Sequence, residues 1–483
     1  MAVKIVNREE ERAAFGELVQ GGGRRLALLY GRRRVGKTYL LTHLWNRRQA
    51  FYFTASATTP EINRRVLVTE ASDWAGEELR PEDHPTWRTV FRALLELRPD
   101  DDVVIVLDEV QYLATDEAGL LEMASELNAV WEGRINRTAG LLLVLSGSAI
   151  RTLEALKNGG SPLYGRLDLS RQLFPFDYYD TGQMVSAYGP VERLRAYAAF
   201  GGMPKYLSLI DTSRSVDENV VDLLLSPNGA VRLQLETVLT QEEGLRDYTT
   251  YQGILQATGT KRRSNGEIAS TLGTELDSGF RRMTSQLARL GFIEGERNFD
   301  EPGNQAIQYR IADPALRMYY GLVLPNESAI ATAGPGIVWR DRLAPQVFPA
   351  YAGQHVFEDV VRQAYSRHWE ARDLPPVTEW GRWAGKDKHR QDAEIDVVAR
   401  LFDGRILTGS VKMRNRPADA TVLMKHVADL ERLADSGRGW AGQALEPGAP
   451  MLFASTSGFK DSFVAASRDL DHPLVLWEAG DLF

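Results

Sequence analysis

The sequence predicts an α/β protein of several domains, and three observations lead to this expectation. Apolar runs of strand length lie at 26–30, 103–107 and 141–145, which is typical of parallel strands covered on both faces. A second pattern of helix, strands and helix begins near residue 326 and continues to the C-terminal end. With 483 residues, the chain is long enough for two to four domains with full-sized cores.

The amino-acid composition and net charge exclude several classes of function. Hydrophobic residues at 43% and charged residues at 25% are ordinary for a globular protein. A net charge of −8 argues against a surface that binds nucleic acid everywhere, so any DNA contact has to be local. The chain has no cysteine, which excludes disulfides, cysteine zinc sites and a cysteine nucleophile. The N-terminal stretch lacks the apolar core of a signal peptide, and no run of about 18 apolar residues occurs, so we expect a cytoplasmic protein without a membrane partner.

The strongest motif follows the first apolar run. Residues 31–38, GRRRVGKT, fit the pattern GxxxxGK[ST] between a predicted strand and an apolar-periodic helix. In such a loop, backbone N–H groups and the helix N-terminus face the phosphates. Lys37 would reach the β- and γ-phosphates, and the Thr38 hydroxyl would ligate Mg²⁺. The predicted nucleotide-binding residues of this loop are Gly31, Arg32, Arg33, Arg34, Val35, Gly36, Lys37, Thr38 and Tyr39.

Two further strand ends carry polar groups. The run at 103–107 ends in Asp108 and Glu109, so a buried parallel strand would deliver both carboxylates to the edge of the sheet. Asp108 would hold Mg²⁺, and Glu109 would orient or deprotonate the attacking water. The strand at 141–150 ends near Ser146 and Ser148. These serines would reach the γ-phosphate or the water, or they are simply turn formers.

The stretches YGRRRVGKTYLL, LDEVQYL, LSGSAIRTLEAL, SPLYGR, LFPFDYYD and FGGMPKYL together resemble the archaeal-type ATPases, P-loop proteins of the AAA+/STAND kind. The resemblance spans essentially the whole chain, and many members carry a C-terminal nuclease-like domain. It implies an ASCE-type core with Glu109 as catalytic base. It also implies that Arg166 acts on the γ-phosphate, in cis or from a neighbouring subunit; a surface arginine after a turn glycine is the alternative. The turn at 201–204 resembles the Gly-x-Pro element that places a helical lid.

Residues 251–312 predict a helix-turn-helix with a wing. Ser264 and Glu267 form a capping-box signature, and the second helix is expected at about 278–290. Its exposed face carries basic and polar residues suited to a DNA major groove, whereas the turn and wing are acidic. DNA contact and a lid that senses the nucleotide state both remain open. The groove-facing set is Arg281, Arg282, Gln286 and Arg289, and the acidic set is Glu275, Asp277, Glu294, Glu296, Asp300 and Glu301.

From residue 326 the order of elements resembles the restriction-endonuclease-like fold. That resemblance implies Glu358 and Asp396 as Mg²⁺ ligands and Lys412 beside the attacking water. The usual acid two residues before the lysine is here Ser410, which lowers the charge at the metal, and Glu394 would partly compensate. An active nuclease and a degenerate domain that binds DNA or a partner are both open. The basic turn at 386–390, with Arg414 and Arg416, would line a DNA backbone.

The predicted architecture is therefore an α/β protein with a P-loop ASCE/AAA+ core at 1–185, a helical lid at 186–245, a winged helix-turn-helix at 246–325, and a restriction-endonuclease-like α/β domain at 326–483. The predicted function is ATP binding and hydrolysis, with ATP and Mg²⁺ as cofactors, on or near DNA. One alternative is an ATP-gated, Mg²⁺-dependent DNA nuclease effector of the defence or toxin type. Another is a non-cleaving, nucleotide-switched DNA-binding or signalling protein. DNA and a second copy of the chain are the candidate partners.

Overall fold

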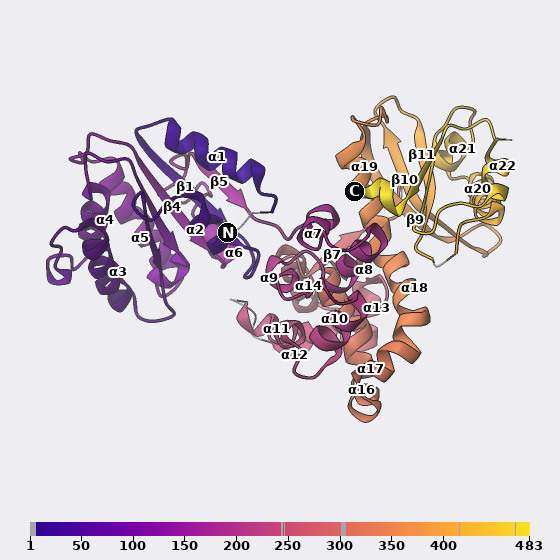
Figure 1. Ribbon diagram of the computed structural model, residues 1–483, viewed down its shortest axis with the longest axis horizontal. Coiled ribbons are helices and arrows are strands. Elements are labelled where there is room, and N and C mark those ends of the chain that lie inside the picture. Colours follow the sequence, from indigo (N-terminus) through magenta and orange to yellow (C-terminus); the bar gives the residue numbers. More distant parts are fainter. Residues whose placement is uncertain (1–5, 243–244, 246, 301–305, 415, 469) are drawn as a thin grey trace. The chain divides into compact units, whose positions relative to one another are not determined.

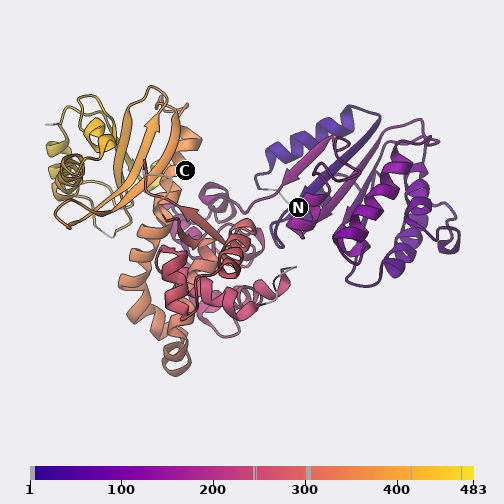
Figure 2. The same cartoon turned by 180° about the vertical axis from the view of Figure 1, so that it is seen from behind.

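The computed structural model describes residues 6–242, 245, 247–300, 306–414, 416–468 and 470–483. The chain forms two compact units (Figures 1 and 2). Unit 1 comprises Met1–Pro175 and Met203–Lys205, and unit 2 comprises Phe176–Gly202 and Tyr206–Phe483.

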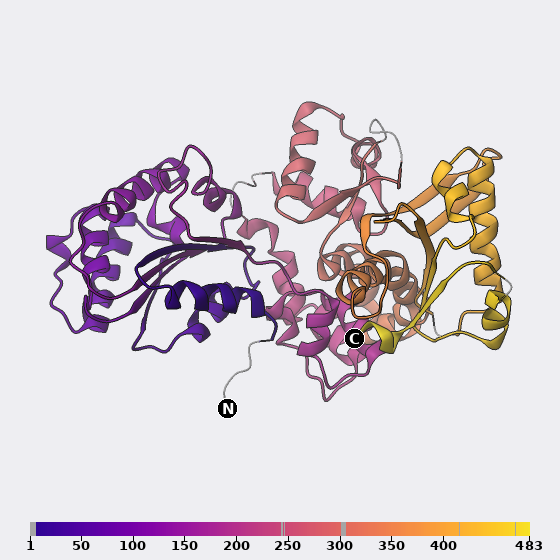
Figure 3. The same cartoon turned by 90° about the horizontal axis from the view of Figure 1, so that it is seen from above.

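Unit 1 is built on a five-stranded parallel sheet with the strand order β2-β3-β4-β1-β5. Its strands are β1 (Arg24–Tyr30), β2 (Ala50–Thr54), β3 (Val103–Asp108), β4 (Leu141–Gly147) and β5 (Leu169–Gln172). Its helices are α1 (Glu9–Gln20), α2 (Lys37–Leu44), α3 (Pro60–Ala75), α4 (Trp87–Glu96), α5 (Glu117–Trp131) and α6 (Ile150–Ala155), with short 3-10 turns at Pro81–Asp83 and Val110–Leu113. Helices α3, α4 and α5 share one apolar cluster with the sheet strands, and Figure 3 shows the sheet between α1 and these helices. Because both faces are covered, β3 and β4 are buried along their whole length, and the predicted α/β fold is confirmed for this unit.

Unit 2 begins with helices and a small antiparallel sheet of order β6-β8-β7. Its first helices are α7 (Tyr178–Met184), α8 (Pro190–Phe200), α10 (Val216–Val220) and α11 (Ala230–Glu236), with a π-turn at Val221–Leu225 and a 3-10 turn at Leu239–Gln241; α9 (Pro204–Leu207) has residues in both units. The next elements are α12 (Tyr248–Thr258), β6 (Arg263–Ser264), α13 (Asn265–Leu272), α14 (Ser278–Arg289), β7 (Ile293–Glu296) and β8 (Gln308–Ile311). The capping box of Ser264 and Glu267 is present and starts α13, as the sequence predicted.

A nearly continuous helical arm leads from β8 to the second sheet. It comprises α15 (Pro314–Met318), a π-turn at Tyr319–Val323, a 3-10 turn at Leu324–Asn326, α16 (Glu327–Ala333), α17 (Pro335–Val338), a π-helical stretch at Trp339–Val347, α18 (Phe348–Ala352), a second such stretch at Gly353–Phe357, and α19 (Glu358–His368). Pro345 lies inside the first π-helical stretch and Pro349 starts α18. Proline has no N–H to donate and crowds the preceding turn, which explains the widened turn around Pro345.

The second sheet has the order β13-β12-β11-β10-β9. Strands β9, β10 and β11 are antiparallel, and β11, β12 and β13 are parallel. Its elements are β9 (Val377–Lys386), β10 (Asp392–Leu401), β11 (Ile406–Lys412), α20 (Ala420–Asp435), α21 (Gly439–Ala444), β12 (Met451–Ser455), α22 (Asp461–Arg468), β13 (Leu474–Glu478) and a final turn at Ala479–Leu482. Helices α20, α21 and α22 cover one face and close an apolar cluster with the strands. Among the described residues, no helix is long and apolar enough to cross a membrane.

Candidate nucleotide site and acidic cluster

The phosphate-type loop connects β1 to α2 at the carboxyl edge of the first sheet. Gly31 has a φ of +154°, and a Cβ built there would lie 2.4 Å from the Leu173 carbonyl oxygen, so only glycine fits. Gly36, with a φ of +95°, precedes α2, and Pro204 of the 201–204 turn lies beside it. Leu173 therefore leaves no room for a side chain at residue 31, and Pro204 lies at van der Waals distance from residue 36.

Lys37 lies inside this loop. Its side chain is buried, and its ammonium donates to the carbonyl oxygens of Gly31 at 2.8 Å and Arg32 at 3.2 Å. Both acceptors belong to the loop itself, so the charge is held where the loop backbone converges. A lysine in this position is available to phosphate oxygens that enter the loop.

Asp108 stands at the end of β3, and three donors hold its carboxylate. The Thr38 hydroxyl donates to Oδ2 at 2.7 Å, the Tyr52 hydroxyl donates to the same oxygen, and the Glu109 N–H donates to Oδ1 at 3.0 Å. Burial and the neighbouring Asp108 charge raise the pKa of Tyr52, so its phenol keeps its proton. A carboxylate and a hydroxyl at this distance are hard oxygen ligands of the kind that Mg²⁺ prefers, so the residues fit that ion.

Glu109 is the next residue, and its backbone adopts a left-handed conformation with a φ of +54°. This turn directs the side chain toward the end of β4. There its Oε2 accepts from the Ser148 hydroxyl at 2.7 Å, from the Ser148 N–H at 3.3 Å, and from the Gln111 amide. The structure thus brings Ser148 to Glu109. Ser146 is fully buried two residues earlier and makes no such contact among the described residues.

The remaining residues of the predicted nucleotide set lie around the loop. Arg33 reaches Ser148 at 3.4 Å and also bonds Tyr112. Arg32 is largely buried, Arg34 has a positive φ, and Val35 is buried in the core. Tyr39 is 39% exposed and stacks on His43 on the outer surface of α2. Of the loop arginines, Arg33 therefore points toward the end of β4, whereas Tyr39 lies on the outer surface of α2.

Arg166 lies at the opposite edge of the sheet. Arg166 pairs with Glu132 at 2.8 Å, just beyond the C-terminal end of α5. It also precedes β5, whose first residue, Leu169, pairs with Ala27 in the middle of β1. Since β1 runs seven residues from that edge to the loop, the separation is about 20 Å. This position disfavours a cis role for Arg166, so the alternative in which a neighbouring subunit brings it to the γ-phosphate stays a prediction.

A second cluster of charged groups lies in unit 2. Oxygens of Glu358, Glu394 and Asp396 lie within 4.8 Å of one another. Asp396 is placed there by a β-bulge: Ile395 pairs with Trp383 and Val398 with Gly381, so two residues of β10 oppose Arg382 alone. The donor set consists of carboxylate oxygens, which suits a hard divalent cation.

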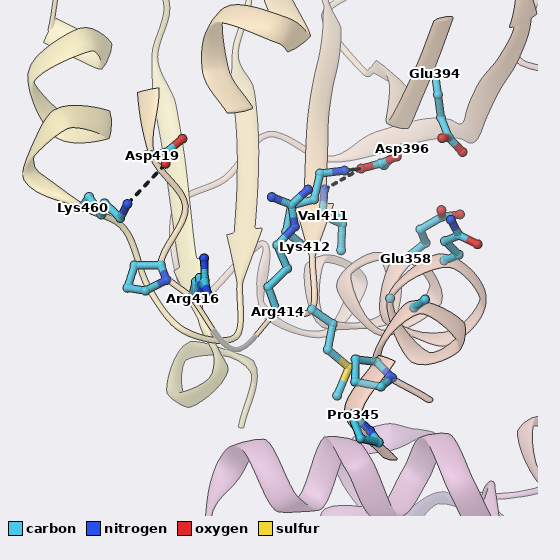
Figure 4. A pocket seen from close by; sticks show the side chains of 16 residues that line it. Pro345, Glu358, Glu394, Asp396, Val411, Lys412, Arg414, Arg416, Asp419 and Lys460 are labelled. Atoms are coloured by element: carbon cyan, nitrogen blue, oxygen red, sulfur yellow. Dashed lines mark hydrogen bonds and ion pairs between the residues drawn. The ribbon is translucent and has the colours of Figure 1, made fainter. Parts of the chain in front are cut away.

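Lys412 belongs to this cluster, as the sequence predicted. Its ammonium lies 2.8 Å from Asp396 Oδ2, and the same oxygen accepts from the Ser410 hydroxyl at 2.9 Å and the Val411 N–H at 2.8 Å (Figure 4). Burial alone would raise the pKa of Asp396, but Lys412 and these hydrogen bonds lower it below the usual value. Ser410 therefore supports Asp396 rather than adding a charge to the cluster.

Two arginines that the sequence did not single out also enter the cluster. Arg382 of β9 lies 3.3 Å from Glu358 and pairs closely with Glu394, and Arg262 lies 3.1 Å from Glu358. Burial raises the pKa of Glu358 to about 7, although both arginines oppose that shift. Three carboxylates thus face three cations, the third being Lys412, and the formal charge of the set is zero.

A cleft of about 690 Å³ opens beside this cluster. Figure 4 shows the acidic residues on one side and Arg414, Arg416 and Lys460 toward the other. Lys460 is paired with Asp419 at 3.3 Å. The turn at 386–390, for which a DNA contact and a solvated loop were both considered, has two lysines in exposed ion pairs. Lys386 pairs with Asp392 at 3.0 Å and Lys388 pairs with Asp435.

The hairpin after α14 is docked on the second sheet. The Phe299 N–H donates to the Arg382 carbonyl at 2.8 Å, and Asn298 exchanges hydrogen bonds with the backbone of Ala384 at 2.9 and 3.1 Å. Phe299 is 3% exposed in the apolar cluster of that domain. Glu301 of the predicted acidic wing lies outside the described residues.

Helix α14 only partly matches its predicted outer face. Arg281, Arg282 and Arg289 are exposed, but Gln286 is half-buried and accepts a hydrogen bond of 2.8 Å from the Tyr251 hydroxyl. The inclusion of Gln286 among groove-facing residues is therefore wrong. Its amide holds α14 to α12 instead.

A parallel sheet carrying this loop, with Asp108 and Glu109 at the end of the strand two places away from β1, is typical of P-loop nucleotide-binding domains. Residues 5–210 match the family model described as an ATPase domain predominantly from Archaea. The chain is 25% identical over 404 residues to "Uncharacterized protein MJECL04" of Methanocaldococcus jannaschii, covering 82% of this chain and 84% of the relative.

The solved structures that the chain matches include the Walker-type ATPase PABY2304 of Pyrococcus abyssi. It is 22% identical with a TM-score of 0.47, over 65% of this chain and 96% of that one. A second is the Aeropyrum pernix ORC1 protein in complex with DNA, which is 18% identical with a TM-score of 0.35, over 68% of this chain and 95% of that one.

Proposed function

We propose that unit 1 binds ATP and hydrolyses it. The observation that carries this proposal is the contact of 2.7 Å between the Thr38 hydroxyl and Asp108, which joins the loop to the strand that also bears Glu109. The loop N–H groups and Lys37 would bind the phosphates. Thr38 and Asp108 would hold Mg²⁺, which supplies neutralisation of the phosphate charge.

Glu109 is proposed as the group that accepts a proton from the attacking water. Its Oε2 is fixed by Ser148 and Gln111, so a defined orientation of the other oxygen is already built into the fold. Ser148 and Arg33 bound the same space from β4 and from the loop. A positioned general base of this kind contributes about 10²- to 10⁴-fold to a rate.

The test compares the wild type with Glu109→Gln and Lys37→Ala. We expect Glu109→Gln to bind a fluorescent ATP analogue normally but to lose about 100-fold or more in turnover. Lys37→Ala should weaken nucleotide binding, because the buried ammonium that faces the loop is gone. A wild type that hydrolyses ATP no faster than both variants would refute the proposed activity.

For unit 2 we infer a lid at 186–245, a winged helix at 246–325 and a restriction-endonuclease-like domain at 326–483. The three helices α12, α13 and α14 with the sheet β6-β8-β7 support the winged helix. The mixed sheet with Asp396 and Lys412 on adjacent strands supports the nuclease-like domain.

We propose as a second function that the C-terminal domain binds a nucleic-acid backbone along its cleft. Arg414 and Arg416 line the cleft and would contact phosphates. Binding is favoured over cleavage because the three carboxylates are already matched by three cations, which leaves little net attraction for a metal ion. Metal-dependent cleavage is the rival, and it requires that Arg382 move away from Glu358 and Glu394.

Labelled single- and double-stranded DNA, incubated with Mg²⁺ or Mn²⁺, distinguishes the two. We expect the protein to bind DNA without metal. The binding should weaken in Arg414→Ala and as salt is added. Cutting that Asp396→Ala abolishes would instead establish a nuclease. Failure to bind either DNA would remove the second function and leave the ATPase proposal intact.

A further inference from the structure

Gln111 is a buried polar residue beside the nucleotide site to which the sequence analysis gave no role. It lies in the short 3-10 turn Val110–Leu113 that follows β3, and its side chain is 7% exposed. Its Nε2 donates to Glu109 Oε2 and lies 3.3 Å from the Ser148 hydroxyl. Among the described residues, its Oε1 has no hydrogen-bond partner.

The surroundings of Gln111 are shaped to hold an amide. A Cβ built on Gly147 would lie 2.3 Å from Gln111 Oε1, so a larger residue at the end of β4 would displace this side chain from its present position. The other side is closed by Glu109, whose left-handed backbone sends its carboxylate toward the same strand end. The amide is thus wedged between the third and fourth strands of the sheet.

An unpaired buried carbonyl is unfavourable, and an apolar side chain of the same size would avoid it. What an apolar residue could not supply is the N–H directed at Glu109. Since Nε2 has to face the carboxylate, the amide orientation is fixed and Oε1 is forced toward Gly147. The hydrogen bond from Gln111 to Glu109 therefore accounts for an amide at this position.

We propose that Gln111 is a positioning residue that fixes the rotation of the Glu109 carboxylate for catalysis. Together with Ser148 it holds Oε2, and this leaves Oε1 of Glu109 as the oxygen that meets the attacking water. Without Gln111 the carboxylate would rotate about its last torsion and lose alignment with the water. This inference rests on the proposed ATPase activity, and it adds a residue to that site.

The experiment uses Gln111→Met in the full chain, because methionine keeps the length and volume of glutamine but cannot donate. We expect turnover to fall by about 10-fold or more, within the total contribution of a general base. The dissociation constant for a fluorescent ATP analogue should stay within about two-fold, since the hydrogen bonds of Gln111 go to Glu109 and Ser148 rather than to the loop at 31–38 in the described part of the chain. Gln49→Met, at the opposite edge of the sheet where β2 begins, is the matched control and should change neither quantity.

A double-mutant cycle separates positioning from a general structural effect. In a Glu109→Gln background, Gln111→Met should cause no further loss in single-turnover hydrolysis, because the group that it positions is absent. An equal loss in both backgrounds, or unchanged turnover in the wild-type background, would overturn the inference while leaving the ATPase proposal standing. If the wild type itself does not hydrolyse ATP, the proposed function fails and the inference falls with it.

Gln111→Glu is the second variant, in case Gln111→Met folds poorly by circular dichroism. It keeps the shape of the side chain but replaces the donor by a second carboxylate facing Glu109. We expect it to lose more turnover than Gln111→Met, because the two charges repel and the base is pushed away. Turnover equal to that of the wild type would refute the proposed role.

Discussion

Replacing Arg310 should destabilise unit 2 more than any surface ion pair. The guanidinium is 2% exposed on β8 and lies 2.8 Å from Glu294, 2.7 Å from Glu296 and 2.7 Å from Asp359 of α19. It therefore ties the β7-β8 hairpin to the helical arm that carries Glu358. We take Arg310→Met as the perturbation, since methionine fills most of the volume but leaves three carboxylates without their shared cation.

The magnitude follows from burial. Removing one partner of a buried ion pair costs about 3–5 kcal/mol, because the remaining charges stay desolvated. The pKa of Asp359 gives an independent check: burial alone would raise it, but Arg310 holds it down at about 2. When the pKa of a carboxyl falls from 3.8 in the unfolded chain to about 2 in the folded protein, the group stabilises the fold by about 2 kcal/mol above pH 3.8. This stabilisation is lost as the pH falls through 2. Arg310→Met should lose that contribution at neutral pH, so its stability should also depend less on pH between 5 and 2.

Urea unfolding, followed by tryptophan fluorescence and by hydrogen-exchange mass spectrometry of peptides from β8 and α19, measures the loss in unit 2. Arg340→Met is the matched control, since Arg340 is 72% exposed and pairs only with its neighbour Asp341 among the described contacts. It should leave unfolding unchanged. A loss below about 1 kcal/mol for Arg310→Met would show that the charges relax into water and that the reasoning from burial is wrong.

Three further predictions concern the other sites. Tyr52→Phe removes one of the two hydroxyl donors to Asp108 Oδ2, so the Mg²⁺ concentration needed to tighten binding of a fluorescent ATP analogue should rise several-fold, and unchanged Mg²⁺ dependence would contradict this role. Ser410→Glu should strengthen Mn²⁺ binding measured by calorimetry if the acidic cluster is merely weakened, whereas no gain would indicate a domain that only binds. Phe299→Ala should cost about 3–5 kcal/mol in urea unfolding, because the ring is buried in the core of the second sheet, and a loss near zero would mean that the hairpin is not docked there.

Much of unit 1 could be predicted because its signals are local. The run at 103–107 and the loop at 31–38 each lie within one short stretch of chain, and strand, glycine and helix start follow directly from that stretch. The motif residues Thr38 and Asp108 lie 70 positions apart, yet both were expected to hold the same Mg²⁺, because the strands of one parallel sheet bring their carboxyl ends to one edge. The roles of these residues in catalysis remain predictions.

Whether Arg166 acts in cis could not be decided from the sequence, because no local signal places this residue. Its position depends on which end of the sheet the chain reaches after α6, and no local pattern encodes that. Gln286 was misjudged because Tyr251, on another helix, takes up its amide. A helical periodicity gives the direction of a side chain but not the partner that it meets.

The sequence by itself determined the α/β class of unit 1 and the phosphate-type loop, and its resemblance to the nuclease-like fold pointed to Asp396 and Lys412, which lie on the adjacent strands β10 and β11. Only the tertiary structure decided that Gln111 and Tyr52 join the nucleotide site, and that Arg262 and Arg382 balance the charge of the acidic cluster. The physical reason is that a strand or loop motif is set by short-range sterics and periodicity. Hydrogen bonds and ion pairs between segments many residues apart depend on how those segments pack, and one isolated glutamine or arginine leaves no pattern from which that packing could be inferred.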